Sequence, residues 1–333
     1  MRIDVGALYA FAWRQAPRLP GAVLRGAANL GADVAWLRRG GGVRRLEANL
    51  ARVRPDLSRA QVRRLSRAGM RSYLRYFGEA FALSGASREQ IDARVRAVGL
   101  DRVVEHTREG RAVVLALGHL GNWDLAGAWA TRAVAPVTTV AERLEPPEVF
   151  DEFLRFRESI GLRILALGDG DVFRQLVRGV RTGGAGLFPL LADRDLTHSG
   201  VEVDLFGRRA RVAAGPAALS LATGAPLLTT LITYERLHGE RRRRARSPWG
   251  IVISFVPVAP VGDDVPRADR VRVLTQAWVD ALAAGIADSP QDWHMLQRVF
   301  VEDLDPVRYA ATRARAGETD AQSAADEAGT VRP

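Results

Sequence analysis

A histidine and an aspartate stand close together directly after a strongly apolar segment. His119 and Asp124 belong to the run His-Leu-Gly-Asn-Trp-Asp, which follows the apolar residues 112–117. A sugar hydroxyl becomes a good nucleophile once a base takes its proton, and neutral imidazole can do this near neutral pH. A carboxylate on the other ring nitrogen fixes the tautomer and stabilises the imidazolium. We therefore predict His119 as a general base and Asp124 as its orienting partner.

The position of this pair favours a functional site but leaves a second interpretation open. Open α/β sheets form their sites beyond the carboxyl ends of strands, which is where His119 falls if 112–117 is a strand. Gly118 and Gly121 allow a tight turn there, and Asn122 can cap a following helix. The alternative is a buried structural histidine with an aspartate that complements a helix dipole.

Beyond residue 112, short apolar segments alternate with stretches of helical spacing. The candidate strands are 112–117, 137–140, 162–165, 185–191, 201–205, 226–232 and 251–256. The candidate helices are 122–132, 147–159, 171–180, 215–223 and 269–286. This alternation predicts an α/β fold with a mostly parallel central sheet of about seven strands flanked by helices.

The N-terminal part, residues 1–95, is predicted to be helical. Apolar residues recur at helical spacing around 8–13, over 22–37 and over 59–84. The first two of these helices carry Trp and Phe and are followed by arginines, so they either lie in a membrane interface or pack on the core. We treat 1–310 as one domain, with 96–310 as its α/β catalytic part, and 311–333 as a disordered tail.

The chain is strongly basic, and all of its basic Lys/Arg positions are arginine. Lys and Arg total 48 against 38 Asp and Glu, the net charge is +10, and lysine and cysteine are absent. Such a surplus predicts an anionic partner: a phospholipid surface, a phosphorylated co-substrate or nucleic acid. Nucleic-acid binding would need stacking platforms or a reading motif, and the sequence has neither, so we expect none. The arginine run 240–246 is predicted to be a solvated loop or a contact to lipid headgroups.

Several mechanisms are excluded by residue type. A chain without lysine or cysteine has no Schiff-base amine and no thiol nucleophile, and a Gly-x-Ser-x-Gly elbow is also absent. The histidines lack metal-ligand spacing, so we expect no metal and no bound cofactor. We find no secretory signal and no apolar run of the ~18 to 20 residues that a spanning helix needs, so we expect a peripheral protein.

The linked motifs resemble one known family. The run at 119–124 looks like the histidine–aspartate motif of the glycerolipid acyltransferase superfamily and, more closely, of the lipid A lauroyl-acyltransferase family. Further runs are similar to that family's other blocks: Arg-Leu-Glu-Ala-Asn-Leu at 45–50, Met-Arg-Ser-Tyr at 70–73, Ala-Asp-Arg-Asp-Leu at 192–196 and Gln-Asp-Trp-His-Met at 291–295. Aspartate after the tryptophan resembles the actinobacterial phosphatidylinositol mannoside branch.

This resemblance implies a function and a set of binding residues. It implies an acyl-CoA donor, with palmitoyl typical, and a mannose hydroxyl of a phosphatidylinositol mannoside as acceptor, on the cytoplasmic face of the plasma membrane. By local pattern it assigns substrate-binding roles to five residues, Glu142, Arg157, Asp193, Arg194 and Glu202. Asp193 stands where close relatives often have glutamate, so either Asp193 or Glu202 is the second acid. Each of these residues can instead form a surface salt bridge.

Three other functions compete with this one. A lipid A-type lauroyl or myristoyl transferase would share the chemistry and differ in donor and acceptor. A nucleic-acid-binding protein is suggested only by the arginines. A non-catalytic lipid-binding scaffold would keep its function when His119 is replaced. His294, beside Trp293, is interpreted as a structural residue.

Overall fold

The structure is a computed structural model that describes residues 15–143, 147–167, 171–197, 199–307, 309–312 and 314. Its helices, in chain order, are η1 (Ala16–Arg18), α2 (Gly21–Arg38), α3 (Gly41–Val53), α4 (Arg59–Leu83), α5 (Arg88–Arg94), α6 (Leu100–Arg108), α7 (Trp123–Ala133), α8 (Pro147–Ser159), α9 (Val172–Thr182), α10 (Gly215–Thr223), α11 (Gly239–Ala245), α12 (Arg267–Asp288), η2 (Pro290–Asp292) and η3 (Val301–Asp303). Its strands are β1 (Val95–Val98), β2 (Ala112–Leu117), β3 (Thr138–Ala141), β4 (Arg163–Ala166), β5 (Gly186–Leu191), β6 (Gly200–Leu205), β7 (Arg208–Ala213), β8 (Leu227–Arg236) and β9 (Trp249–Pro257).

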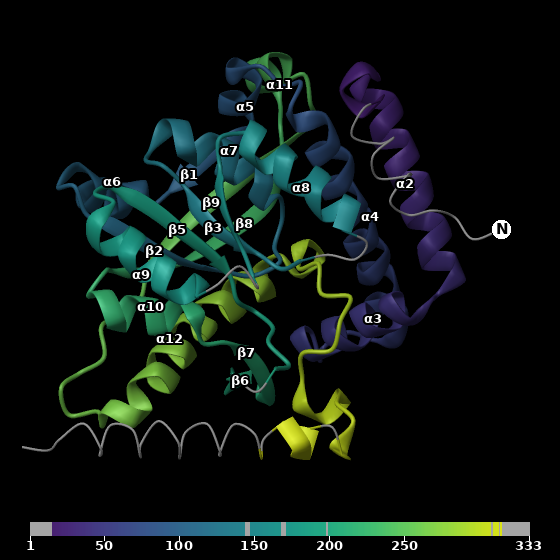
Figure 1. Cartoon of the computed structure of the whole chain (residues 1–333). Helices are drawn as coiled ribbons and strands as arrows, with labels where there is room; N and C mark the ends of the chain where they lie inside the picture. Colours follow the sequence, from purple (N-terminus) through teal and green to yellow (C-terminus); the bar gives the residue numbers. More distant parts are fainter. Residues whose placement is uncertain are drawn as a thin grey trace, which may run out of the picture.

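A five-stranded sheet forms the centre of the molecule (Figure 1). Its strand order is β1-β9-β8-β2-β5. Strands β8, β2 and β5 are parallel to one another, β9 is antiparallel to β8, and β1 is parallel to β9. The ends of β2 and β5, the end of β8 and the start of β9 therefore meet at one edge of the sheet.

Helices cover both faces of this sheet, so the core has two halves. Alternate residues of β2 point to opposite faces, and all six are buried. Val114 and Ala116 pack with side chains of α9, α10 and α12, whereas Val113 and Leu115 pack with those of α4, α7 and α8. The fold is thus the predicted α/β sandwich, and β2 is buried on both sides as its continuous apolar sequence indicated.

The central sheet has fewer strands than the roughly seven predicted. All seven candidate strands exist, but β3 and β4 pair only with each other, and β6 forms an antiparallel hairpin with β7. A single bridge, Val137 to Leu187, joins the start of β5 to the segment before β3. The N–H of Leu187 donates to Pro136, and two residues further on Pro189 points the same way without an N–H. We attribute the break between β5 and β3 to this proline.

The N-terminal helices pack as a separate group beside the sheet (Figure 1). Helices α2, α3 and α4 share a small core around Leu46, Leu50 and Met70. Among the helices of the described residues, none has the length and apolar content required to cross a bilayer. The helix predicted around 8–13 lies outside the described residues, as does the predicted tail from residue 315 on.

The arginine run at 240–246 was predicted to be a loop, and this prediction is wrong. The chain forms the short helix α11 there, and its one buried residue, Ala245, packs against Ala93 and Leu237. Arg241 and Arg244 pair with Glu235 and Glu89. A single small apolar residue and neighbouring carboxylates are enough to hold this short helix, which a charge count alone does not reveal.

Candidate active site

The ends of the neighbouring strands β2 and β5 bring His119 and Asp193 together. The Nδ1 atom of His119 lies 2.5 Å from Oδ1 of Asp193, and the backbone N–H of His119 donates to Oδ2 at 2.9 Å. Each of these two residues lies two positions beyond the end of its strand, and the strands pair in parallel over their full length. The site therefore forms where adjacent parallel strands end at the same edge.

Asp193 is a buried carboxylate whose position is fixed from three sides. Only 1% of its side chain is exposed, and the indole N–H of Trp293 donates to Oδ2 at 2.9 Å. A Cβ at position 118 would lie 3.2 Å from Oδ2 of Asp193 and 3.0 Å from Leu282, so only glycine leaves the carboxylate its place. Since Asp193 accepts at every one of these contacts, Nδ1 of His119 carries the proton and Nε2 is the basic nitrogen.

The charge of Asp193 tunes the imidazole. Burial acts to lower the pKa of His119, but the negative charge and hydrogen bond of Asp193 outweigh burial, so the pKa is raised. Burial acts to raise the pKa of Asp193, and the contacts to His119 and Trp293 outweigh it, so that pKa is lowered. The His119 side chain is 37% exposed, and Nε2 has no hydrogen bond within the described residues. The basic nitrogen is thus available to a substrate hydroxyl.

Asp124 is not the carboxylate on His119, contrary to our prediction. It lies in the first turn of α7, is fully buried, and its two oxygens are occupied by other partners. Arg157 of α8 donates to Oδ1 at 2.8 Å, and the hydroxyl of Tyr76 of α4 donates to Oδ2 at 2.7 Å. At the start of a helix the side chain of Asp124 turns back toward α4 and α8 rather than to the strand end. Asp124 therefore joins three helices behind the His119 loop.

The C-terminal motif around residue 293 braces the loop that carries His119. Leu120 and Trp293 form an antiparallel bridge, the N–H of His294 donates to the carbonyl of His119 at 2.8 Å, and Gly121 donates to Asp292 at 2.9 Å. Gly121 has φ +61°, and a Cβ there would lie 2.2 Å from the carbonyl oxygen of Ile232. The N–H groups of residues 119–121 all donate to protein acceptors. The N–H groups of residues 119–121 are therefore not free to bind a developing oxyanion.

Three other predicted site residues differ in their relation to His119. Arg194 follows Asp193, is half-buried, and its positive charge acts on His119. Glu142 is exposed just beyond β3 and makes no hydrogen bond or ion pair within the described residues. Glu202 lies in the β6–β7 hairpin, where it pairs with Arg209 and Arg211. Of the two candidate second acids, Asp193 is the one in contact with His119.

Tyr76 and Glu79, both on α4, were missed at the sequence level. Tyr76 is one turn beyond Ser72, whose hydroxyl lies 3.0 Å from Nε2 of His294. Burial lowers the pKa of His294 to about 3, so this second histidine stays neutral. The spacing of Ser72, Tyr76 and Glu79 puts them on one helix face, and that spacing was the available signal.

No group of three side chains suited to a metal ion occurs among the described residues.

Comparison with known proteins agrees with the motifs. The model of the bacterial lipid A biosynthesis acyltransferase family matches residues 2–302. Phosphatidylinositol mannoside acyltransferase of Mycolicibacterium smegmatis is 37% identical over 307 residues, which cover 92% of this chain and 94% of the relative. The protein of the same name from Mycobacterium tuberculosis H37Rv is 37% identical over 309 residues, 92% of each chain.

A solved structure is similar more weakly. The 1-acyl-sn-glycerophosphate acyltransferase PlsC of Thermotoga maritima aligns with 81% of this chain and 97% of its own, at 14% identity and a TM-score of 0.34. A likeness of that size carries no argument about function.

The chain belongs to the bacterial lipid A biosynthesis acyltransferase family, because the family model spans nine-tenths of it. It is an acyltransferase, and the family resemblance predicted from the motifs is confirmed.

Proposed function

We propose that this enzyme transfers a fatty acyl group, palmitoyl above all, from acyl-CoA to a mannose hydroxyl of a phosphatidylinositol mannoside. The observation that carries the proposal is the His119–Asp193 pair, with an accessible Nε2 at the end of β2. Two relatives with 37% identity, both named for this acceptor, support the choice of substrate.

The reaction follows from the protonation states of the pair. Nε2 of His119 takes the proton of the acceptor hydroxyl while the oxygen attacks the thioester carbonyl, and Asp193 stabilises the imidazolium that forms. When the carbon–sulfur bond breaks, the imidazolium returns the proton to the departing sulfur, which leaves as free CoA. Donor and acceptor are bound together, and no acyl-enzyme forms.

The N–H groups of residues 119–121 already have acceptors, so the oxyanion of this reaction requires another donor. Arg194 is the candidate, since it adjoins Asp193 and its charge already acts on the imidazole. Charge placed where the oxyanion develops can stabilise the transition state strongly, and Arg194 makes no ion pair within the described residues that would compete for it.

Membrane docking at the cytoplasmic face is part of the proposal. Helix α2 and Leu19, two residues before it, expose several large apolar side chains: Leu19 (45%), Val23 (54%), Leu30 (68%), Val34 (37%) and Leu37 (68%). The basic residues Arg38, Arg39 and Arg44 lie at the end of this helix and just beyond it, and suit anionic headgroups. Flotation with anionic vesicles tests this surface. Leu30→Ser with Leu37→Ser should weaken binding, whereas Val307→Ser, another exposed position, should not.

The decisive experiment is mass spectrometry of products from the purified protein. It receives palmitoyl-CoA with either a mannosylated phosphatidylinositol or a lipid A precursor. We expect one added acyl group on the mannoside alone. Acylation of only the lipid A precursor would favour the lauroyl- or myristoyl-transferase alternative, and no product with either acceptor would contradict the proposal.

A further inference from the structure

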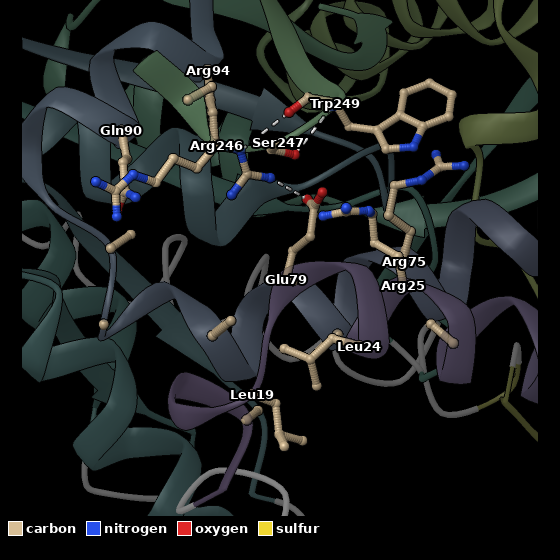
Figure 2. A pocket seen from close by; sticks show the side chains of 18 of the residues that line it. Leu19, Leu24, Arg25, Arg75, Glu79, Gln90, Arg94, Arg246, Ser247 and Trp249 are labelled. Carbon is tan, nitrogen blue, oxygen red and sulfur yellow. Dashed lines mark hydrogen bonds and ion pairs between the residues drawn. The ribbon is translucent and has the colours of Figure 1, made fainter. Parts of the chain in front are cut away.

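A cavity lies along the same sheet edge as His119. It has a volume of about 370 Å³ and is bounded by α2, α4, α5 and the segment between α11 and β9 (Figure 2). This volume is in the range of small-molecule sites. His119 does not line the cavity.

The walls of this cavity carry an unbalanced positive charge. Four arginines, Arg25, Arg75, Arg94 and Arg246, line it against one carboxylate, Glu79. Only Arg94 pairs with Glu79, at 2.7 Å. Arg25, Arg75 and Arg246 make no ion pair within the described part of the chain, and Arg75 instead lies 3.7 Å from the ring of Trp249. A cavity wall with four guanidinium groups and a single carboxylate favours a phosphate as occupant.

Glu79 adds a second requirement for the occupant. Its side chain is 10% exposed, and Oε2 accepts hydrogen bonds from Asn122 and Tyr234 and forms the ion pair with Arg94. The other oxygen, Oε1, is buried and has no hydrogen-bond partner. A buried carboxylate oxygen without a donor is costly, and a ligand hydroxyl would satisfy it. Figure 2 places this carboxylate between the side chains of Arg25 and Arg94.

The opposite wall of the cavity is apolar. Leu19, Leu24 and Ala28 line it from the N-terminal part of the chain, and Figure 2 shows the two leucines apart from the guanidinium groups. The exposed apolar residues of α2 begin at the same place. A ligand that fits both walls carries a phosphate, a hydroxyl and an alkyl part, which describes a polyol phospholipid approached from the membrane.

The distance from the cavity to His119 suits one extended molecule. Trp249 starts β9, which lies two strands from β2, or about 10 Å across the sheet at the usual strand spacing. Trp249 pairs with Arg236 whereas Leu117 pairs with Thr230, so Trp249 also lies about four residues, or about 13 Å, further along the strands than His119, and the straight distance is about 16 Å. The hydrogen bond from Asn122 to Glu79, at 2.8 Å, connects the cavity wall with the His119 loop. A phosphate, a polyol ring and attached sugar residues joined end to end can span a gap of this length.

We propose that this cavity binds the phosphodiester of the acceptor lipid through its arginines, while a neighbouring polyol hydroxyl donates to Glu79. The proposal rests on the function given above and assigns the acceptor, rather than the donor, to the space between α2 and α4. The acceptor's sugar then extends along the sheet edge to Nε2 of His119.

The test is a binding measurement without donor, so it does not depend on turnover. Wild-type protein is titrated at fixed ionic strength with phosphatidylcholine vesicles that contain or lack phosphatidylinositol, and separately with glycerophosphoinositol and with free CoA. Arg25→Gln and Arg246→Gln are compared with Arg243→Gln, which removes the same charge from the exposed face of α11, where Arg243 pairs with Glu240.

We expect each cavity variant to weaken binding of phosphatidylinositol and of glycerophosphoinositol by about tenfold, and Arg243→Gln by less than about twofold. Binding of CoA should not change. Equal losses in all three variants would reduce the effect to surface charge, and a selective loss of CoA binding would assign the cavity to the donor; either result overturns the proposal. Normal phosphatidylinositol binding through Arg25 in a protein that acylates no mannoside would instead contradict only the proposed function.

Discussion

Two buried aspartates near the His119 loop have different roles. Asp193 contacts an imidazole that is 37% exposed, and only one of its ring nitrogens is occupied. Asp124 has both oxygens occupied, by Arg157 and Tyr76, and lies with its partners among helices. The first carboxylate controls a group that can meet substrate, and the second controls the relative position of α4, α7 and α8.

The difference shows how position on an element decides what a carboxylate can do. Asp193 arrives from the strand beside β2, so it reaches the same edge as His119. Asp124 is only five residues from His119, but the turn of the helix directs it to the other side. Nearness in sequence therefore identified the wrong partner for His119. The following experiments test whether Asp193 and Asp124 have different roles, in order of expected effect on activity.

Replacing the imidazole should have the largest effect. His119→Ala removes the proposed general base, and we expect kcat to fall by about 10²–10⁴-fold, the range for general base catalysis. The exposed His238→Ala is the matched control and should keep full activity. Steady-state kinetics measure both. If kcat of His119→Ala stayed within about threefold of wild type, the non-catalytic lipid-binding scaffold would be the better interpretation.

Replacing the carboxylate on the imidazole should alter the pH dependence as well as the rate. In Asp193→Asn the charge that raises the pKa of His119 is lost while burial, which lowers it, remains. The acid limb of kcat/KM, set by loss of the proton from Nε2, should therefore move to lower pH, and kcat should fall by about 100-fold. Asp195→Asn serves as control. A limb that stays in place would mean that Asp193 does not set the protonation of His119.

Replacing the other aspartate should mainly cost stability. Asp124→Asn leaves Arg157 buried without its counter-charge, and removing one partner of a buried pair costs about 3–5 kcal/mol in the free energy of unfolding. Denaturant unfolding measures this loss. Asp101→Asn, at the first turn of α6 but 79% exposed, should change stability by less than about 0.5 kcal/mol.

The kinetics of the same variant test the comparison itself. We expect kcat of folded Asp124→Asn to fall by about tenfold or less, since the His119 loop loses a brace but keeps Asp193. Its acid limb should not move. If that limb moved as far as in Asp193→Asn, the two aspartates would share one function and the contrast drawn above would be wrong.

The sequence predicted where the strands lie better than it predicted which strands pair with each other. Continuous apolar runs located β2 and β5 to within one residue, because burial on both faces requires such runs, and they located the start of β8 but not its polar last four residues. Strand β7 was missed because three of its six residues are arginines, and its pairing with β6 supplies the stability that its composition does not indicate. The His119–Asp193 contact depends on β2 and β5 being adjacent, which the sequence order of the strands does not reveal.

Removing the tyrosine hydroxyl from the Asp124 cluster should have the smallest effect. Tyr76→Phe deletes one hydrogen bond to a buried carboxylate, which costs about 1.5–3 kcal/mol of stability, and kcat should change by less than about threefold. A double-mutant cycle sharpens the result: Tyr76→Phe with Asp124→Asn should show a coupling energy above about 0.5 kcal/mol, and Tyr76→Phe with Asp193→Asn should be additive. Coupling of Tyr76 to Asp193 instead would mean that the helix cluster and the imidazole pair respond as one network, so that a change behind the loop reaches the base.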